Sequence, residues 1–179
     1  MTDSIFDLTG KVALVTGGSR GLGLAMAEAF AERGANLIVA SRKADACAAA
    51  AREITARFGV AALPVACNVS SWDDCDALIG RAYARFGRVD VLVNNAGMSP
   101  LYPSLDQVSE ALWDKVVAVN LKGPFRLTAV IGSRMAAGAG GSIINVSSTA
   151  GAIAFESLGA YVTTKFAIRG LSRAISLAF

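Results

Sequence analysis

A glycine-rich segment directly after a short apolar run constrains the fold most strongly. Residues 12–15 read Val-Ala-Leu-Val, a continuous apolar run typical of a strand that is buried on both faces in a parallel sheet. The segment Thr16-Gly17-Gly18-Ser19-Arg20-Gly21-Leu22-Gly23 follows at once, and a helical pattern then ends at Arg33-Gly34, where glycine suits a helix cap. Glycines let a backbone approach a pyrophosphate, and the free amides of a helix N-terminus favour its charge. The segment therefore predicts a phosphate-binding turn.

The segments that follow extend this turn into a nucleotide-binding unit. Residues 36–40 predict a second buried strand, residues 45–58 a helix, and residues 61–66 a third strand. Such a βαβαβ unit, with right-handed crossovers, places a nucleotide at the carboxyl ends of its strands. Because the G-x-x-x-G-x-G spacing departs from the general G-x-G-x-x-G fingerprint, the prediction depends on this context.

The end of the second strand indicates which dinucleotide is bound. An acidic residue there would accept hydrogen bonds from the adenosine ribose, but this chain has Ser41-Arg42-Lys43, with Arg20 in the glycine turn. Cations that converge on one place favour a 2′-phosphate, and hence NADP over NAD. The alternative is that they are solvated charges at a strand end.

The ends of the next two strands add candidate cofactor contacts. Asn68 and Val69 close the third strand, where the Asn68 amide could bond an adenine edge. Ser71 is expected to cap a helix over residues 72–86. Residues 89–93 predict a fourth strand that leads into Asn94-Asn95-Ala96-Gly97. The small residues there leave room for a cofactor, while Asn94 could equally tie neighbouring strands together.

A long helix is predicted from a Ser109 cap through roughly Met135. Asn120 shares a stripe with apolar neighbours and so points a polar group inward. Pro124 lacks the N–H that would bond the Asn120 carbonyl, so we expect a bend at Pro124 and a free carbonyl that can hold a water. The alternative is that Pro124 merely kinks a surface helix.

The segment from Gly141 to Lys165 is a candidate for acid-base chemistry, the alternative being that Tyr161 and Lys165 are a plain surface or half-buried helix pair. Residues 143–146 predict a strand, residues 147–159 a polar loop, and Ala160 begins a helix. Tyr161 and Lys165 are four residues apart, so they share a helix face, and the lysine charge favours the phenolate of a group whose pKa starts at about 10. The chain has no histidine, so acid-base chemistry must use other residues.

Composition excludes several classes of function. A length of 179 residues suits one domain, taken as residues 1–179. The three cysteines, Cys47, Cys67 and Cys75, form no C-x-x-C pair, so we expect packing residues and no metal site. A net charge of +3 with scattered basic residues argues against nucleic-acid binding. With no apolar run long enough to span a bilayer and no secretion signal at the start, we expect a cytoplasmic protein that does not enter a membrane.

Taken together, the motifs resemble the short-chain dehydrogenase/reductase (SDR) family, particularly its compact single-domain branch. They are Thr16-Gly17-x-x-x-Gly21-x-Gly23, Asn94-Asn95-Ala96-Gly97, Asn120, Ser148 and Tyr161-x-x-x-Lys165, in this order. The resemblance covers nearly the whole chain from Lys11. It implies an α/β Rossmann-type fold with a doubly wound parallel sheet, a nicotinamide cofactor, and hydride transfer between that cofactor and a carbonyl or alcohol carbon.

The resemblance also implies roles for individual residues. Tyr161 matches the family's proton donor and acceptor, and Lys165 the residue that lowers the tyrosine pKa and holds the nicotinamide ribose. Ser148 matches the residue that orients the substrate oxygen, although Ser147 stays possible. Asn120 matches the residue that anchors a water in a proton relay to Lys165. The expected cofactor contacts are Gly17, Ser19, Arg20, Gly21, Leu22, Gly23, Ser41, Arg42, Lys43, Asn68, Val69, Asn95, Ala96, Gly97, Tyr161 and Lys165.

One departure from the family concerns the end of the chain. Family members usually continue through two more strands, a Pro-Gly turn and a substrate-covering loop, which these 179 residues lack. We therefore expect that they are part of a longer chain, since the strand at residues 142–146 would otherwise be an uncovered apolar edge.

The predicted function is an NADPH-dependent reductase of a small carbonyl substrate, or the reverse alcohol dehydrogenase. We expect it to form a homo-oligomer, a dimer or tetramer that pairs the long helices. Two alternatives remain: a non-catalytic dinucleotide-binding protein, and a nucleotide-sugar epimerase, which fits the glycine spacing less well.

Overall fold

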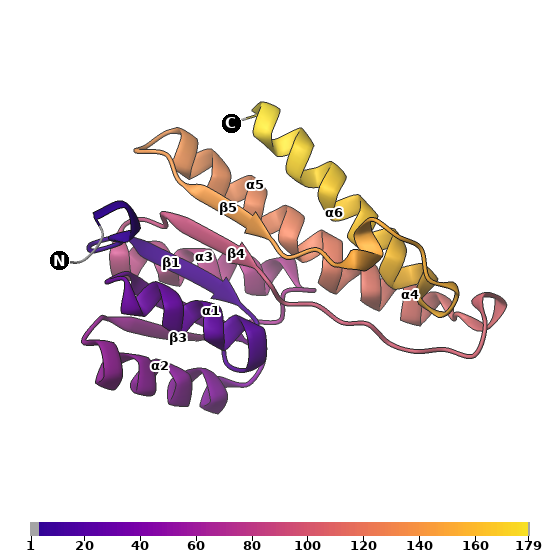
Figure 1. Cartoon of the computed structure of the whole chain (residues 1–179), viewed down its shortest axis with the longest axis horizontal. Helices are drawn as coiled ribbons and strands as arrows, with labels where there is room; N and C mark the ends of the chain where they lie inside the picture. Colours follow the sequence, from indigo (N-terminus) through magenta and orange to yellow (C-terminus); the bar gives the residue numbers. More distant parts are fainter. Residues whose placement is uncertain (1–3, 179) are drawn as a thin grey trace.

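The apolar runs predicted as strands form one parallel sheet. The computed structural model describes residues 4–178, so residues 1–3 and 179 of the predicted domain lie outside the described residues. Its five strands are ordered β3-β2-β1-β4-β5 (Figure 1). They are β1 (Val12–Thr16), β2 (Asn36–Ser41), β3 (Ala62–Ala66), β4 (Val91–Asn94) and β5 (Ser142–Asn145), and every pairing is parallel. The predicted doubly wound parallel sheet is confirmed.

Helices cover both faces of this sheet. They are α1 (Gly21–Glu32), α2 (Ala44–Phe58), α3 (Trp72–Phe86), α4 (Glu110–Val117), α5 (Gly123–Ala136) and α6 (Gly159–Ala178). Side chains alternate along each strand, so Leu14 packs with α3 and α5 in one apolar cluster, and Val15 packs with α1 and α2 in the other. Figure 1 shows α1, α2 and α6 on the near side of the sheet, with α3 and α5 behind it.

Serine caps begin two of these helices as the sequence predicts. Ser71 Oγ accepts a hydrogen bond from Asp74 N at 3.1 Å, and Ser109 Oγ accepts one from Leu112 N at 3.2 Å. Each cap satisfies an amide that has no partner within its helix.

The long helix predicted from Ser109 to roughly Met135 is helical throughout but is not a single α-helix. The structure divides this region into α4, a π-helical segment (Ala118–Lys122) and α5. The Gly123 amide bonds the Ala118 carbonyl, five residues back, and Pro124 falls in the first turn of α5. The irregular segment therefore ends just before the proline and includes Asn120, four residues before it.

Asn94 has the structural role that the sequence left open. Its Nδ2 donates to Thr128 Oγ1 on α5 and to Asn145 Oδ1 on β5, both at 2.9 Å. Asn145 Nδ2 in turn donates to Ser172 Oγ on α6 at 2.9 Å. This chain of side chains joins β4, β5, α5 and α6.

The three cysteines are buried and free, which agrees with their predicted packing role. A hydrogen bond with Cys75, together with burial, raises the pKa of Cys67.

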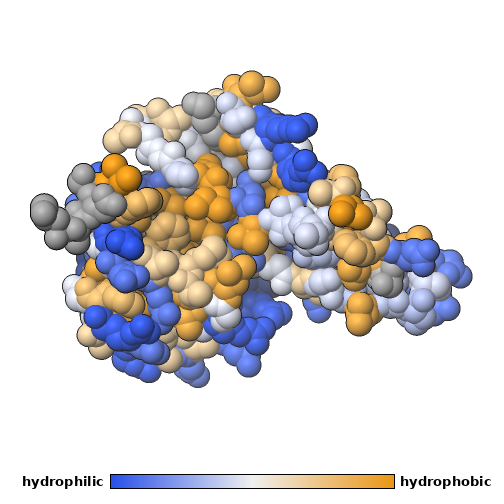
Figure 2. All heavy atoms as spheres, viewed as in Figure 1, coloured by the Kyte–Doolittle hydropathy of each residue, from blue (hydrophilic) through white to orange (hydrophobic). Residues whose placement is uncertain are grey.

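The near face is incompletely covered beside α1. Ile144 of β5 is 40% exposed, and Figure 2 shows apolar residues at the surface in this region. No helix within residues 4–178 is long and apolar enough to cross a membrane.

Strand order fixes the position of the candidate site. The chain leaves β1 toward β2 and β3, then crosses back to β4 on the other side of β1. In such sheets a crevice forms outside the carboxyl ends of the two strands where the order reverses. Here those strands are β1 and β4.

Candidate active site

Hydrogen bonds join the carboxyl ends of β1 and β4. The buried Thr16 Oγ1 accepts from Asn95 N at 3.0 Å and from Ala96 N at 3.1 Å. Asn95 Nδ2 donates to the Thr16 carbonyl at 2.9 Å. The glycine turn and the Asn95-Ala96-Gly97 segment, distant in sequence, therefore lie side by side.

Close packing at Gly23 brings the start of α1 onto this junction. A Cβ at Gly23 would collide with the carbonyl oxygen of Gly17 and would lie 2.5 Å from Asn95 Nδ2. Only glycine allows this approach. The first amides of α1 thus sit at the crevice, and a helix N-terminus in this position favours a phosphate. This cradle fits the pyrophosphate of a dinucleotide.

The glycine turn also contacts the end of β2. The hydroxyls of Ser19 and Ser41 are hydrogen-bonded at 2.8 Å, and Gly18 N donates to the Ala40 carbonyl at 3.2 Å. The residues that follow these serines are the exposed cations Arg20 and Arg42. The structure therefore places the basic residues, including the exposed Lys43, on adjoining segments.

The turn after β3 is stabilised by local hydrogen bonds and contacts the start of α5. Asn68 Oδ1 accepts from Ser70 Oγ at 2.9 Å, and Asn68 N donates to Asp74 Oδ2 at 2.9 Å. Val69 is buried, and its backbone lies against Gly123, where a Cβ would collide with the Val69 carbonyl oxygen. The exposed side chain of Asn68 is thus fixed through its oxygen.

Asn120 is buried in the π-helical segment and ties two other segments together. Its Oδ1 accepts from Met98 N, and its Nδ2 donates to Met98 O, both at 2.9 Å. The same Nδ2 donates to Thr164 Oγ1 at 3.1 Å, and Thr164 Oγ1 donates to the Tyr161 carbonyl at 2.8 Å. The side chain therefore connects the loop after β4 with the helix that carries Tyr161.

Lys165 is the buried cation of the site. Its Nζ donates to the Val146 carbonyl at 2.7 Å and lies 5.6 Å from the centroid of the Tyr161 ring. A Cβ built at Gly97 would lie 3.9 Å from Nζ and 3.5 Å from Asn120 Oδ1. Burial lowers the pKa of Lys165. Gly97, Asn120, Tyr161 and Lys165 thus converge.

The two candidate serines have different hydrogen bonds. Ser147 Oγ donates its proton to the Lys165 carbonyl at 3.2 Å. Ser148 Oγ accepts from Ala150 N at 3.1 Å, which leaves its own proton free to donate.

Three contributors to the site do not follow from the motifs. The Val146 carbonyl holds Lys165, Thr164 links Asn120 to α6, and Tyr102 bonds the first turn of α6 through its hydroxyl. Thr164 follows Tyr161 by three residues, so helical spacing could have revealed it. Tyr102 lies in an aperiodic loop that carries no such signal.

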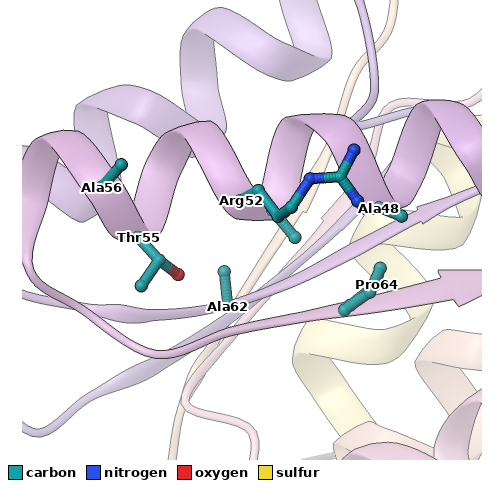
Figure 3. A pocket seen from close by; sticks show the side chains of 7 residues that line it. Ala48, Arg52, Thr55, Ala56, Ala62 and Pro64 are labelled. Carbon is teal, nitrogen blue, oxygen red and sulfur yellow. The ribbon is translucent and has the colours of Figure 1, made fainter.

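A separate hollow lies between α2 and β3 (Figure 3). It measures about 390 Å³, and its lining includes Ala48, Arg52, Thr55 and Pro64. It is away from the carboxyl ends of β1 and β4, and its alanine and proline surfaces supply no acid-base group. The crevice above those two strands remains the candidate active site.

The chain matches a family model described as short chain dehydrogenase over residues 11–179. It is 37% identical over 174 residues to the D-threitol dehydrogenase of Mycolicibacterium smegmatis, covering 97% of this chain and 66% of that protein. It is 33% identical to the NAD-dependent glycerol dehydrogenase of Listeria innocua, covering 98% of this chain and 67% of that protein. The chain spans between 59% and 67% of the length of eight curated relatives that it matches.

A similar solved structure is a metagenomic short-chain oxidoreductase in complex with NADP. Its TM-score is 0.89 with 39% identity, and the match covers 93% of this chain and 75% of the other. The five-stranded parallel sheet with flanking helices is therefore one that this chain shares with solved oxidoreductases.

Proposed function

Because the chain belongs to the short-chain dehydrogenase family, we propose that it is an NADPH-dependent oxidoreductase acting on a carbonyl or alcohol carbon. The observation that carries the proposal is the convergence of Tyr161, Lys165 and Asn120 near Gly97, which ends the segment that adjoins the glycine turn. The bound dinucleotide would supply or accept the hydride. Its pyrophosphate would lie at the Gly17–Gly23 turn, and its nicotinamide end beside Gly97 and Lys165.

The proton is the contribution of the protein. Tyr161 gives its phenol proton to the carbonyl oxygen during reduction and takes it back during oxidation. The buried ammonium of Lys165, 5.6 Å from the ring centroid, stabilises the phenolate by Coulomb attraction. Ser148 donates a hydrogen bond that orients the substrate oxygen. Asn120 anchors the water through which Lys165 exchanges protons with solvent.

The cations beside Ser19 and Ser41 support NADP over NAD. Arg20, Arg42 and Lys43 lie on segments joined by the 2.8 Å hydroxyl contact, and a guanidinium pairs well with a phosphate. One similar structure contains NADP, whereas one relative is named as NAD-dependent. We expect Arg42→Ala to weaken NADPH binding about ten-fold and to leave NADH binding nearly unchanged. Arg33→Ala, an exposed arginine at the far end of α1, is the control for fluorescence titrations with both cofactors.

The substrate class proposed from the relatives is a small polyol or its ketone. The names of the relatives include threitol and glycerol dehydrogenases. A panel of threitol, sorbitol, glycerol and matched ketones, followed by NADPH absorbance in both directions, tests this class.

The proton role has a direct test. Tyr161→Phe removes only the phenol oxygen, so we expect turnover to fall by at least about a hundred-fold while the NADPH dissociation constant stays unchanged. Tyr83→Phe makes the same change on α3, outside the site, and should keep full activity. Equal turnover in Tyr161→Phe and wild type would refute the role. NADPH binding without turnover of any substrate would favour a non-catalytic dinucleotide-binding protein.

We also propose a homo-oligomer that pairs α4, α5 and α6. Each of these helices exposes a large aromatic side chain: Trp113 is 41%, Phe125 46% and Phe166 45% exposed. Aromatic residues are enriched at protein interfaces. Sedimentation velocity of wild type and Phe166→Glu would test the pairing, and an unchanged monomer in both would refute it.

A further inference from the structure

Tyr102 is buried in a loop, residues 98–108, whose other residues are exposed or half-buried. It follows Leu101, which is 79% exposed, and precedes Leu105, which is 63% exposed, yet Tyr102 itself is only 9% exposed. A tyrosine buried in this way usually has a partner for its hydroxyl. The loop is thus anchored through one side chain.

The partner of Tyr102 is the first turn of α6. Its hydroxyl oxygen accepts a hydrogen bond from Ala160 N at 3.2 Å. The first amides of a helix have no acceptor within the helix, so Tyr102 caps α6 from a different part of the chain. Tyr102 Oη and Leu105 Cδ2 also close over Gly159, lying 3.2 and 2.5 Å from where a Cβ would stand.

The residue after Ala160 is Tyr161. Before α6, residues 152–156 are all exposed. On the other side of Tyr161, Thr164 is fixed by Asn120, which also holds both backbone polar groups of Met98. Helix α6 is therefore held on both sides of Tyr161, at Ala160 by Tyr102 of the loop and at Thr164 by Asn120, which also binds the start of that loop.

We infer that Tyr102 is a positioning residue for Tyr161, acting through the backbone of Ala160. It fixes the first turn of α6 and so the position of the phenol relative to Lys165 and Ser148. This inference rests on the proposed function, because the phenol must act as an acid for its position to matter. Loss of the cap leaves the Gly23 cradle untouched, because that cradle is built by Gly17 and Asn95 on other segments.

The test is Tyr102→Phe, which removes the accepting oxygen and retains the ring. We expect kcat to fall about ten-fold, as small displacements of a reacting group do, with an unchanged NADPH dissociation constant. The pH profile of kcat/KM should also shift, because the phenol moves relative to Lys165. Amide hydrogen exchange at Ala160, measured without substrate, should accelerate roughly five-fold as for a lost cap. Tyr83→Phe is the matched control and should change none of these quantities.

The outcomes separate this inference from the proposed function. If Tyr161→Phe is inactive but Tyr102→Phe keeps the wild-type kcat and pH profile, the positioning role is overturned and the function stands. A lower melting temperature with unchanged kcat would likewise reduce Tyr102 to a structural cap. If wild type turns over no substrate, the proposed function fails and the positioning role fails with it, while faster exchange at Ala160 still reports the cap.

Discussion

Among single residues, Gly23 shows how a missing side chain shapes the site. The approach of α1 to the end of β1 requires that nothing stand between Gly23 and the Gly17 carbonyl. Backbone atoms cannot yield as a flexible side chain can. The geometry of the cradle therefore requires a residue without a Cβ atom at position 23.

Gly23→Ala is expected to reduce stability by about 1–3 kcal/mol, as overpacking does, and to abolish most NADPH binding. Gly80→Ala is the matched control, since a Cβ at that position in α3 meets no atom within 4 Å. Alanine there should be neutral or stabilise by about 0.5–1 kcal/mol. Urea unfolding and NADPH titration of both variants check this pair, and equal effects would contradict the steric account.

Lys165 should make stability depend on pH. Burial lowers its pKa below the ordinary 10.5, so between the folded value and 10.5 the unfolded chain holds a proton that the folded chain lacks. The free energy of unfolding therefore rises with pH across that interval. Lys165→Met removes this rise, so the stability of wild type relative to the variant should increase with pH.

Urea unfolding from about pH 7 to about pH 10 measures this difference. Lys115→Met, at an exposed position on α4, is the control. A difference between wild type and Lys165→Met that stays constant across the range would contradict the effect of burial.

The sequence motifs predicted which residues of the candidate site lie near one another on a helix, but not the tertiary contacts that hold them in place. Spacing placed Tyr161 and Lys165 on one helix face, and an inward stripe placed Asn120. The contacts of Tyr102 with Ala160 and of Lys165 with the Val146 carbonyl are tertiary. They depend on how loops fold back onto α6, which no local pattern encodes.

For the elements, local signals predicted most strands and helices. Apolar runs and serine or glycine caps suffice for α2, α3 and the strands. The π-helical segment at Ala118–Lys122 was missed because Pro124 suggested a bend at itself. A proline is also well tolerated in the first turn of a helix. The sequence alone therefore does not distinguish a bend at Pro124 from a new helical turn that begins there, and the packing on both sides decides between them.

The hydrogen-bonded side chains Asn94, Asn145 and Ser172 link β4, β5 and α6. Breaking the buried bond between Asn94 and Asn145 should reduce stability more than breaking the exposed bond to Ser172. Asn145→Ala removes the acceptor of the buried Asn94 amide, and we expect a loss of about 1–2 kcal/mol. Ser172→Ala removes the exposed end of the same chain and should cost no more than about 0.5 kcal/mol. Thermal or urea unfolding compares them, and an equal loss in both would mean that burial does not control the cost.

For the molecule as a whole, the order of the strands was implicit in the βαβαβ pattern. Right-handed crossovers and the return from β3 to β4 place the expected crevice outside the carboxyl ends of β1 and β4. The sequence could not show which segments meet across that crevice. Contacts such as those of Thr16 with Asn95 and Ala96 join residues about eighty positions apart.

The contact between Val69 and Gly123 has a consequence for the thermodynamics of the whole molecule. Val69 belongs to the turn at the nucleotide half of the crevice, and Gly123 follows directly on the π-helical segment that holds Asn120. Linkage between two sites is reciprocal. If a bound dinucleotide orders the turn at Val69, then a change in the helix at Gly123 that disturbs this turn lowers the affinity for the dinucleotide. Gly123→Ala should thus weaken NADPH binding by about five-fold or more, without touching the nucleotide. Gly170→Ala, at a position on α6 where a Cβ meets no atom within 4 Å, should leave NADPH binding unchanged in the same titration.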